Sequence, residues 1–154
     1  MNTNEIYLKQ EFPIKANQIF FDHAKVSPLP RRVCDAVNNF IIDASEYGTK
    51  HYKEWMMEVE RVRGQFACLI NGDIDEVAFI KNTSEGVSIV ANGLDWQAGD
   101  NVVIPDIEFP SNVYPWWNLK RLGVETRMVK AKGGRILFDD LVNHTDNRTR
   151  IVSV

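Results

Sequence analysis

The chain has 154 residues, of which 44% are hydrophobic and 25% are charged, and this is enough apolar material for one domain with a buried core. Its formal net charge of −3 gives no general attraction to nucleic acid or to an anionic membrane, and no basic run resembles a nucleic-acid footprint. The polar start MNTNEIYLKQEF does not resemble a signal peptide, and no apolar stretch is long enough to span a bilayer. We therefore expect a cytoplasmic protein.

The first half of the chain predicts helices. Residues 17–30, NQIFFDHAKVSPLP, are expected to form an extended segment that ends in a proline-rich turn. Apolar residues at helical spacing then predict one helix that ends near Gly48 and a second helix over residues 52–70. We interpret the apolar stripe of the second helix as core; it comprises Trp55, Met56, Val59, Val62, Phe66 and Leu69.

Two cysteines, Cys34 and Cys68, fall inside these helical patterns. The pattern predicts buried small apolar side chains in a reducing compartment. Neither cysteine has another Cys or a His at ligand spacing, so we expect no metal site.

Strands and helices alternate in the second half. The pattern predicts strands over 76–80, 101–107, 125–131 and 149–154, with helices over 84–94, 112–123 and 137–144. This alternation predicts an α/β fold, with a three-layer, mainly parallel sheet flanked by helices and preceded by an N-terminal helical segment. We place the domain boundary between residues 72 and 73, so that 1–72 form an N-terminal arm and helices and 73–154 an α/β domain.

The turn at residues 81–86, KNTSEG, opens a helix that follows a predicted strand. Free backbone amides and the hydroxyls of Thr83 and Ser84 would point outward there, which suits a phosphate group. The alternative is that Thr83 is only the N-cap of the helix, with Glu85 in its first turn.

The loop after the next strand contains Phe109 and lies on the same edge of a parallel sheet, where ligands of such sheets bind. The ring could cover a planar ligand, or it could fill a gap between helix and sheet. Together the two turns favour a phosphorylated aromatic cofactor. The chain lacks the G-x-G-x-x-G pattern of NAD and FAD sites and the G-x-x-x-x-G-K pattern of P-loop proteins.

Three segments carry a resemblance to a known family: FFDHAKVSPLP, FIKNTSEGVSIVANGL and GDNVVIPDIEFPSNVYPWWNLKRLG. In this order they resemble the N-terminal part of class V aminotransferases, fold type I pyridoxal-phosphate enzymes that include cysteine desulfurases and isopenicillin N epimerase-like proteins. The resemblance covers residues 20–154. Cysteine desulfurases usually carry His where this chain has Phe109, which favours the aminotransferase and epimerase-like branch.

The resemblance implies roles for particular residues. Thr83 and Ser84 match the turn that holds the phosphate of pyridoxal 5′-phosphate, and Phe109 matches the aromatic residue that stacks on the pyridine ring. His23, Ala24 and Lys25 match a loop at the substrate entrance, although the family usually has small or amide residues there. Glu108 and Asn112 lie near the site without an assigned role.

The family's Schiff-base lysine usually follows a histidine, and its pyridine-nitrogen aspartate lies on a later strand. The three histidines of this chain, His23, His51 and His144, are followed by Ala24, Tyr52 and Thr145. We therefore expect no catalytic residue in this chain, and we interpret it as the N-terminal piece of a larger enzyme and an incomplete large domain of the fold.

The intact protein would act on an amino-acid substrate through an external aldimine, in a transamination, an epimerisation or an elimination. The resemblance implies a homodimer, and we also expect the chain to self-associate, because the missing strands would leave apolar surface exposed. The alternative is a non-catalytic α/β binding or assembly module that kept the fold without the chemistry.

Overall fold

The structure, a computed structural model, describes residues 3–24 and 26–154. The chain divides into two compact units, Met1–Val77 and Ala78–Val154, and each is described by itself.

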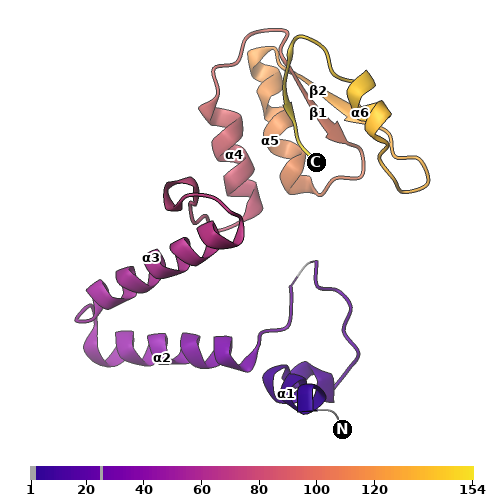
Figure 1. The fold of residues 1–154 in the computed structure, drawn as a ribbon. Helices are drawn as coiled ribbons and strands as arrows, with labels where there is room; N and C mark the ends of the chain where they lie inside the picture. The colour runs from indigo at the N-terminus through magenta and orange to yellow at the C-terminus, as the bar shows by residue number, and fades with distance from the viewer. Residues whose placement is uncertain (1–2, 25) are drawn as a thin grey trace. The chain divides into compact units, whose positions relative to one another are not determined.

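The N-terminal unit is helical. It contains α1 (Thr3–Glu11), a 3-10 turn (Pro13–Ala16), α2 (Arg31–Tyr47), α3 (Tyr52–Leu69) and a second 3-10 turn (Ile74–Glu76) (Figure 1). α2 ends where Gly48 adopts a positive φ of 61° and donates its N–H to the Ala44 carbonyl at 3.0 Å. Asp43 near the end of α2 accepts hydrogen bonds from His51 Nδ1 at 2.7 Å and from Trp55 Nε1 at 3.0 Å. These bonds tie the two predicted helices together at their turn.

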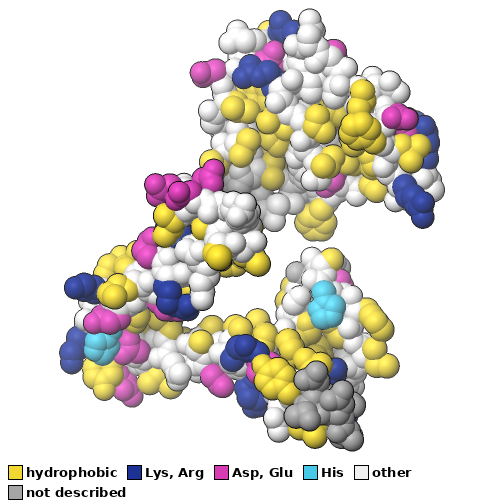
Figure 2. Space-filling view, in the orientation of Figure 1, with side chains coloured by type: hydrophobic (Ala, Val, Ile, Leu, Met, Phe, Trp, Pro, Cys, Tyr) yellow, Lys and Arg dark blue, Asp and Glu magenta, His cyan; other side chains and the backbone are white. Residues whose placement is uncertain are grey.

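The apolar stripe of α3 is not core in this chain, so that prediction was wrong. Among the residues of α3 only Ala67 is buried, while Phe66 and Leu69 are exposed. Cys68 is exposed and Cys34 is half-buried, so the prediction of buried thiols was also wrong. α2 and α3 are joined at their turn but do not pack along their length, so their apolar stripes stay largely uncovered, and Figure 2 shows hydrophobic side chains gathered on their surface.

The C-terminal unit is an α/β fold, as the sequence predicts. In chain order it contains α4 (Thr83–Gly93), β1 (Asn101–Pro105), a 3-10 turn (Pro110–Asn112), α5 (Tyr114–Trp117), a 3-10 segment (Asn118–Leu122), β2 (Glu125–Val129), α6 (Phe138–Asn143) and β3 (Thr149–Val152). The strands form one parallel sheet in the order β2-β1-β3. Figure 1 shows α5 on one side of these strands and α6 on the other.

The core of this unit forms around the central strand. All five residues of β1 are buried, because a strand between two neighbours and between helices has no free face. Val102 and Ile104 pack with Ala91 of α4 and with Trp116 and Leu119. This packing holds α4 and the helical segment after β1 against the same face of the sheet.

One predicted strand is absent. Residues 77–80 form no ladder in the part of the chain that the structure describes, although Val77 has extended backbone angles. A strand needs a neighbour to accept its hydrogen bonds, and the described sheet contains only β2, β1 and β3. The apolar sequence of this segment is thus compatible with a strand that lacks its partner here.

The predicted helix over residues 112–123 is a chain of short turns rather than one helix. Pro110 and Pro115 each stand at the start of a new turn, where proline fits because its missing N–H is not needed. The segment ends at Gly123, whose φ of 77° is left-handed, as predicted for this glycine. Within the described residues, no helix combines the length and the apolar composition that a membrane crossing requires.

Candidate cofactor site

The N-terminus of α4 is capped by Asn82. The Asn82 side-chain oxygen accepts a hydrogen bond from the Glu85 N–H at 2.9 Å. The alternative in which Thr83 is the N-cap was therefore wrong. Because the first amides of a helix have no partner within the helix, the N–H groups of Thr83 and Ser84 stay open to a ligand.

The charges at this turn are nearly balanced. The Glu85 carboxylate accepts a hydrogen bond from the Lys81 N–H at 2.8 Å, and its other oxygen lies 3.6 Å from the Lys81 ammonium. Because Lys81 offsets its negative charge, Glu85 repels an anion at the helix N-terminus less than a free carboxylate would.

Phe109 stands at the carboxyl edge of the sheet, in the loop that follows β1. It precedes the 3-10 turn Pro110–Asn112, and its backbone is extended, with φ −70° and ψ 147°. The residue is 69% exposed. It therefore fills no gap between helix and sheet within the described part of this chain, and its role as a stacking residue stays a prediction.

Ser84 and Phe109 line one cavity of about 380 Å³ (Ser84, Ser88, Phe109, Pro110, Ser111, Tyr114, Pro115 and Asn118 form its wall). Hydroxyl groups of α4 stand on one side of it, and Phe109 and Tyr114 supply aromatic rings. Ser84 and Ser88 also line an adjoining hollow with Lys81 and Glu85. The donor set fits a phosphate beside a planar ring: open amides and serine hydroxyls at a helix N-terminus, then an exposed aromatic face.

The other predicted site residues that the structure describes are not among those that line this cavity. Thr83 is exposed at the first residue of α4 and is not part of the cavity wall. His23 and Ala24 are exposed in a loop of the N-terminal unit, where the His23 ring meets Phe20 edge to face at 5.2 Å and the His23 carbonyl accepts a hydrogen bond from Ser27. Lys25 lies outside the described residues. The place of this loop at a substrate entrance stays a prediction.

Sequence reasoning missed Ser88, Tyr114 and Asn118 as cavity residues. Ser88 had a usable signal, because it follows Ser84 by four residues and so lies on the same face of α4. Tyr114 and Asn118 had none, because the proline-interrupted turns after β1 do not follow one helical period.

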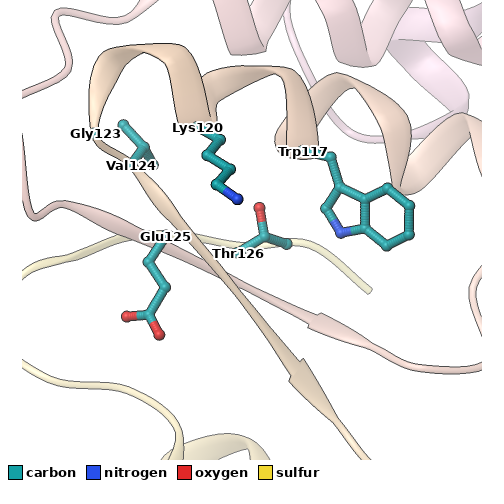
Figure 3. A pocket seen from close by; sticks show the side chains of 6 residues that line it. All are labelled: Trp117, Lys120, Gly123, Val124, Glu125 and Thr126. Atoms are coloured by element: carbon teal, nitrogen blue, oxygen red, sulfur yellow. The ribbon is translucent and has the colours of Figure 1, made fainter.

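A larger hollow of about 770 Å³ lies near the start of β2, away from Phe109. Figure 3 shows Lys120 and Trp117 reaching from the helical segment toward Thr126, while Glu125 points away. Ligands of parallel sheets bind beyond the carboxyl ends of the strands, and this hollow is at the opposite edge. We therefore place the candidate site at the smaller cavity beside α4. Among the described residues, no group of three or more His, Cys, Asp or Glu side chains is placed to hold a metal ion.

Comparisons with known proteins identify the family of this chain. The model of the family described as aminotransferase class-V matches residues 19–154. A probable cysteine desulfurase of Methanothermobacter thermautotrophicus is 33% identical over 159 residues, which cover 100% of this chain and 39% of that protein. A probable cysteine desulfurase of Pyrococcus abyssi is 31% identical, over 80% of this chain and 33% of that protein.

Solved structures share the fold. C-DES with glycine covalently linked to its PLP cofactor is similar with a TM-score of 0.84 and 24% identity, over 94% of this chain and 39% of that chain. The apo cysteine desulfurase of Thermococcus onnurineus has a TM-score of 0.76 and 24% identity, over 91% of this chain and 37% of that chain. The chain thus spans about two fifths of the length of the proteins that it matches. Since the family model matches most of its residues, the chain belongs to the class-V aminotransferase family.

Proposed function

We propose that the protein is a pyridoxal-phosphate enzyme with an amino-acid substrate, and that this chain forms the cradle for its cofactor. Class V aminotransferases depend on this cofactor. The single observation that carries the proposal is the cavity of about 380 Å³ that Ser84 and Phe109 line together. Family resemblance supports a homodimer, and composition supports a cytoplasmic location.

The phosphate end of the cradle is the start of α4. The open amides of Thr83 and Ser84 would donate to phosphate oxygens, and the Ser84 hydroxyl would add a donor from the cavity wall. Asn82 already satisfies the Glu85 amide, so the cap does not compete for the two amides before it. These residues would bind and orient the cofactor without taking part in bond breaking.

The ring end of the cradle is Phe109. When bound, the cofactor would supply an electron sink for the substrate's α-carbon. Phe109 would cover one face of the ring and keep water from that face, which fixes the plane of the ring relative to the phosphate. His23, Ala24 and Lys25 would line the substrate entrance.

The experiment uses protein expressed from the full open reading frame. We expect it to be purified with bound cofactor and a visible absorption band of a cofactor–lysine Schiff base. Three assays then separate the reactions: keto-acid formation, racemisation, and sulfide release from L-cysteine, which the names of the relatives favour. A full-length protein that neither retains nor takes up the cofactor would instead support the non-catalytic module.

Two variants locate the cradle. Ser84→Ala and Phe109→Ala should both weaken cofactor retention, while Ser45→Ala on α2 and Phe138→Ala on α6 should not. Ser45 and Phe138 are exposed residues of the same types in other elements. Equal cofactor retention in all four variants would place the cofactor elsewhere.

A further inference from the structure

Asn112 is a buried polar residue that the proposed function does not use. The residue is only 9% exposed, and it does not belong to the cavity wall. Its side chain makes three hydrogen bonds. Its Oδ1 accepts from Trp116 Nε1 at 3.0 Å and from the Ser153 hydroxyl at 2.5 Å, and its Nδ2 donates to the Ser153 carbonyl at 3.3 Å.

These bonds connect two segments that are 41 residues apart in the chain. Ser153 follows β3 and donates its own N–H to the Val103 carbonyl of β1 at 3.0 Å. Asn112 is therefore anchored to the sheet through Ser153 and to α5 through Trp116, which is 2% exposed. Such an anchor has little freedom to move.

The backbone of Asn112 transmits this anchoring to Phe109. Its N–H donates to the Phe109 carbonyl at 2.8 Å, and the next N–H, that of Val113, donates to the Pro110 carbonyl at 3.1 Å. Because the Phe109 ring is mostly exposed, neighbouring side chains do little to fix its direction. Its backbone must do so, and that backbone is held by the turn that ends at Asn112.

We propose that Asn112 is a positioning residue that sets the plane of the Phe109 ring at the cofactor cavity, through the linked hydrogen bonds of Ser153, Asn112 and Trp116. This inference rests on the proposed function and deepens it. The competing explanation is that the buried network only joins α5 to the sheet. The two explanations predict different results for a variant without the Asn112 side chain. Only the positioning role predicts that its loss weakens cofactor binding through Phe109.

A double-mutant cycle between Asn112 and Phe109 separates the two explanations. It uses full-length protein, and equilibrium dialysis measures the cofactor affinity of each variant. An aromatic stacking contribution corresponds to about a two- to twelvefold change in affinity. We expect Asn112→Ala to weaken affinity within this range and to alter the visible circular dichroism of the bound cofactor. In a Phe109→Ala background, Asn112→Ala should have no further effect, and Asn143→Ala on α6 serves as the neutral control.

Two outcomes overturn the inference. One is that Asn112→Ala lowers the melting temperature but leaves affinity and dichroism unchanged; the other is that its effect is the same with and without Phe109. If Asn112→Ala does not fold, Ser153→Ala takes its place in the double-mutant cycle, because it removes only the hydroxyl that donates to Asn112. The same two outcomes would then overturn the inference. Failure of the proposed function is seen separately, because the unmodified protein would then not bind the cofactor at all.

Discussion

At the scale of single residues, the exposure of Phe109 decides between two energetic roles. A buried Phe typically contributes about 3–5 kcal/mol to folding when it is compared with Ala, whereas Phe109 is 69% exposed. We predict that Phe109→Ala leaves the melting temperature of the cofactor-free protein nearly unchanged and weakens cofactor binding by roughly 0.5–1.5 kcal/mol. Thermal melts beside a cofactor titration test this, and a large loss of stability with unchanged affinity would contradict it.

Asp146 offers a pH-dependent test at the same scale. The Arg127 guanidinium at 2.7 Å, the Asn101 amide at 2.9 Å and the Arg148 N–H at 2.8 Å lower the pKa of Asp146 from 3.8 to about 2. A carboxylate whose pKa is lower in the folded state stabilises the fold above its unfolded pKa. That stability is lost as the pH falls from about 3.8 through about 2.

We therefore predict that Asp146→Asn lowers the urea denaturation midpoint at neutral pH. We also predict that the midpoint of this variant falls less steeply than that of the unmodified protein between about pH 4 and pH 2. Urea denaturation at a series of pH values measures both effects. Asp139→Asn, at an exposed carboxylate on α6, is the control that should keep the decline. An unchanged decline in Asp146→Asn would show that other carboxyls cause it.

Residues of the site differ in how far they could be predicted. That Ser84 and Phe109 lie at one edge of the sheet could be predicted, because each stands in a turn next to an element of the alternating strand and helix pattern; their cofactor roles stay predictions. Asn112 could not be predicted in this way, because its role depends on Ser153, 41 residues away. Sequence patterns within a short window carry no information about such a distant partner.

At the scale of elements, Gly123 ends the segment after α5 and begins the path into β2. Its φ is 77°, and a Cβ there would lie 3.0 Å from Ala98 Cβ and 3.2 Å from Ala98 Cα. Gly133 also has a positive φ, of 59°, but a Cβ there would meet no atom within 4 Å. Alanine substitutions at Gly123 and Gly133 therefore separate the energetic cost of backbone strain from that of a steric contact.

We predict that Gly133→Ala costs roughly 1–2 kcal/mol through left-handed strain alone, and that Gly123→Ala costs more because the Ala98 backbone must also shift. Free energies of unfolding from urea titrations give both values. Equal losses would mean that the Ala98 contact relaxes without penalty.

Periodic elements were predicted well where their partners lie within the chain. β1 is buried on both faces, as its run of Val102, Val103 and Ile104 indicates, and its parallel neighbours follow from the alternation with helices. Residues 77–80 have the same kind of sequence but no neighbouring strand among the described residues, so they form none. The stripe of α3 shows the same limit: a pattern specifies which face is apolar but not what covers it.

At the scale of the whole molecule, the apolar helix faces that nothing in this chain covers stay exposed to solvent. Val37, Phe40 and Ile41 of α2 are each at least half exposed, and such surface favours association. We predict that the 154-residue chain self-associates as its concentration rises in sedimentation experiments. Ile41→Lys should reduce this association more than Ile89→Lys, which adds the same charge at an exposed residue of α4. Equal effects would indicate that net charge, rather than the surface of α2, controls association.

The last prediction concerns chemistry in the 154-residue chain itself. Its histidines are followed by Ala24, Tyr52 and Thr145, so the His-Lys pair that usually supplies the family's Schiff-base lysine is not among its residues. We predict that the chain binds pyridoxal phosphate only reversibly, and that dialysis removes it completely. Borohydride reduction followed by mass spectrometry should find no stoichiometric lysine adduct, and amino acids should not be turned over.

Lys81 provides the control for this experiment, because it lines a hollow with Ser84 beside the proposed phosphate seat. Its ammonium lies 3.6 Å from Glu85, and 75% of its side chain is exposed, so a minor adduct there would reflect a raised local concentration of the aldehyde. Lys81→Arg should abolish such an adduct and leave reversible binding intact, since Arg keeps the charge but forms no Schiff base. A stoichiometric adduct that survives dialysis at one other lysine would contradict the prediction and identify a catalytic lysine within this chain.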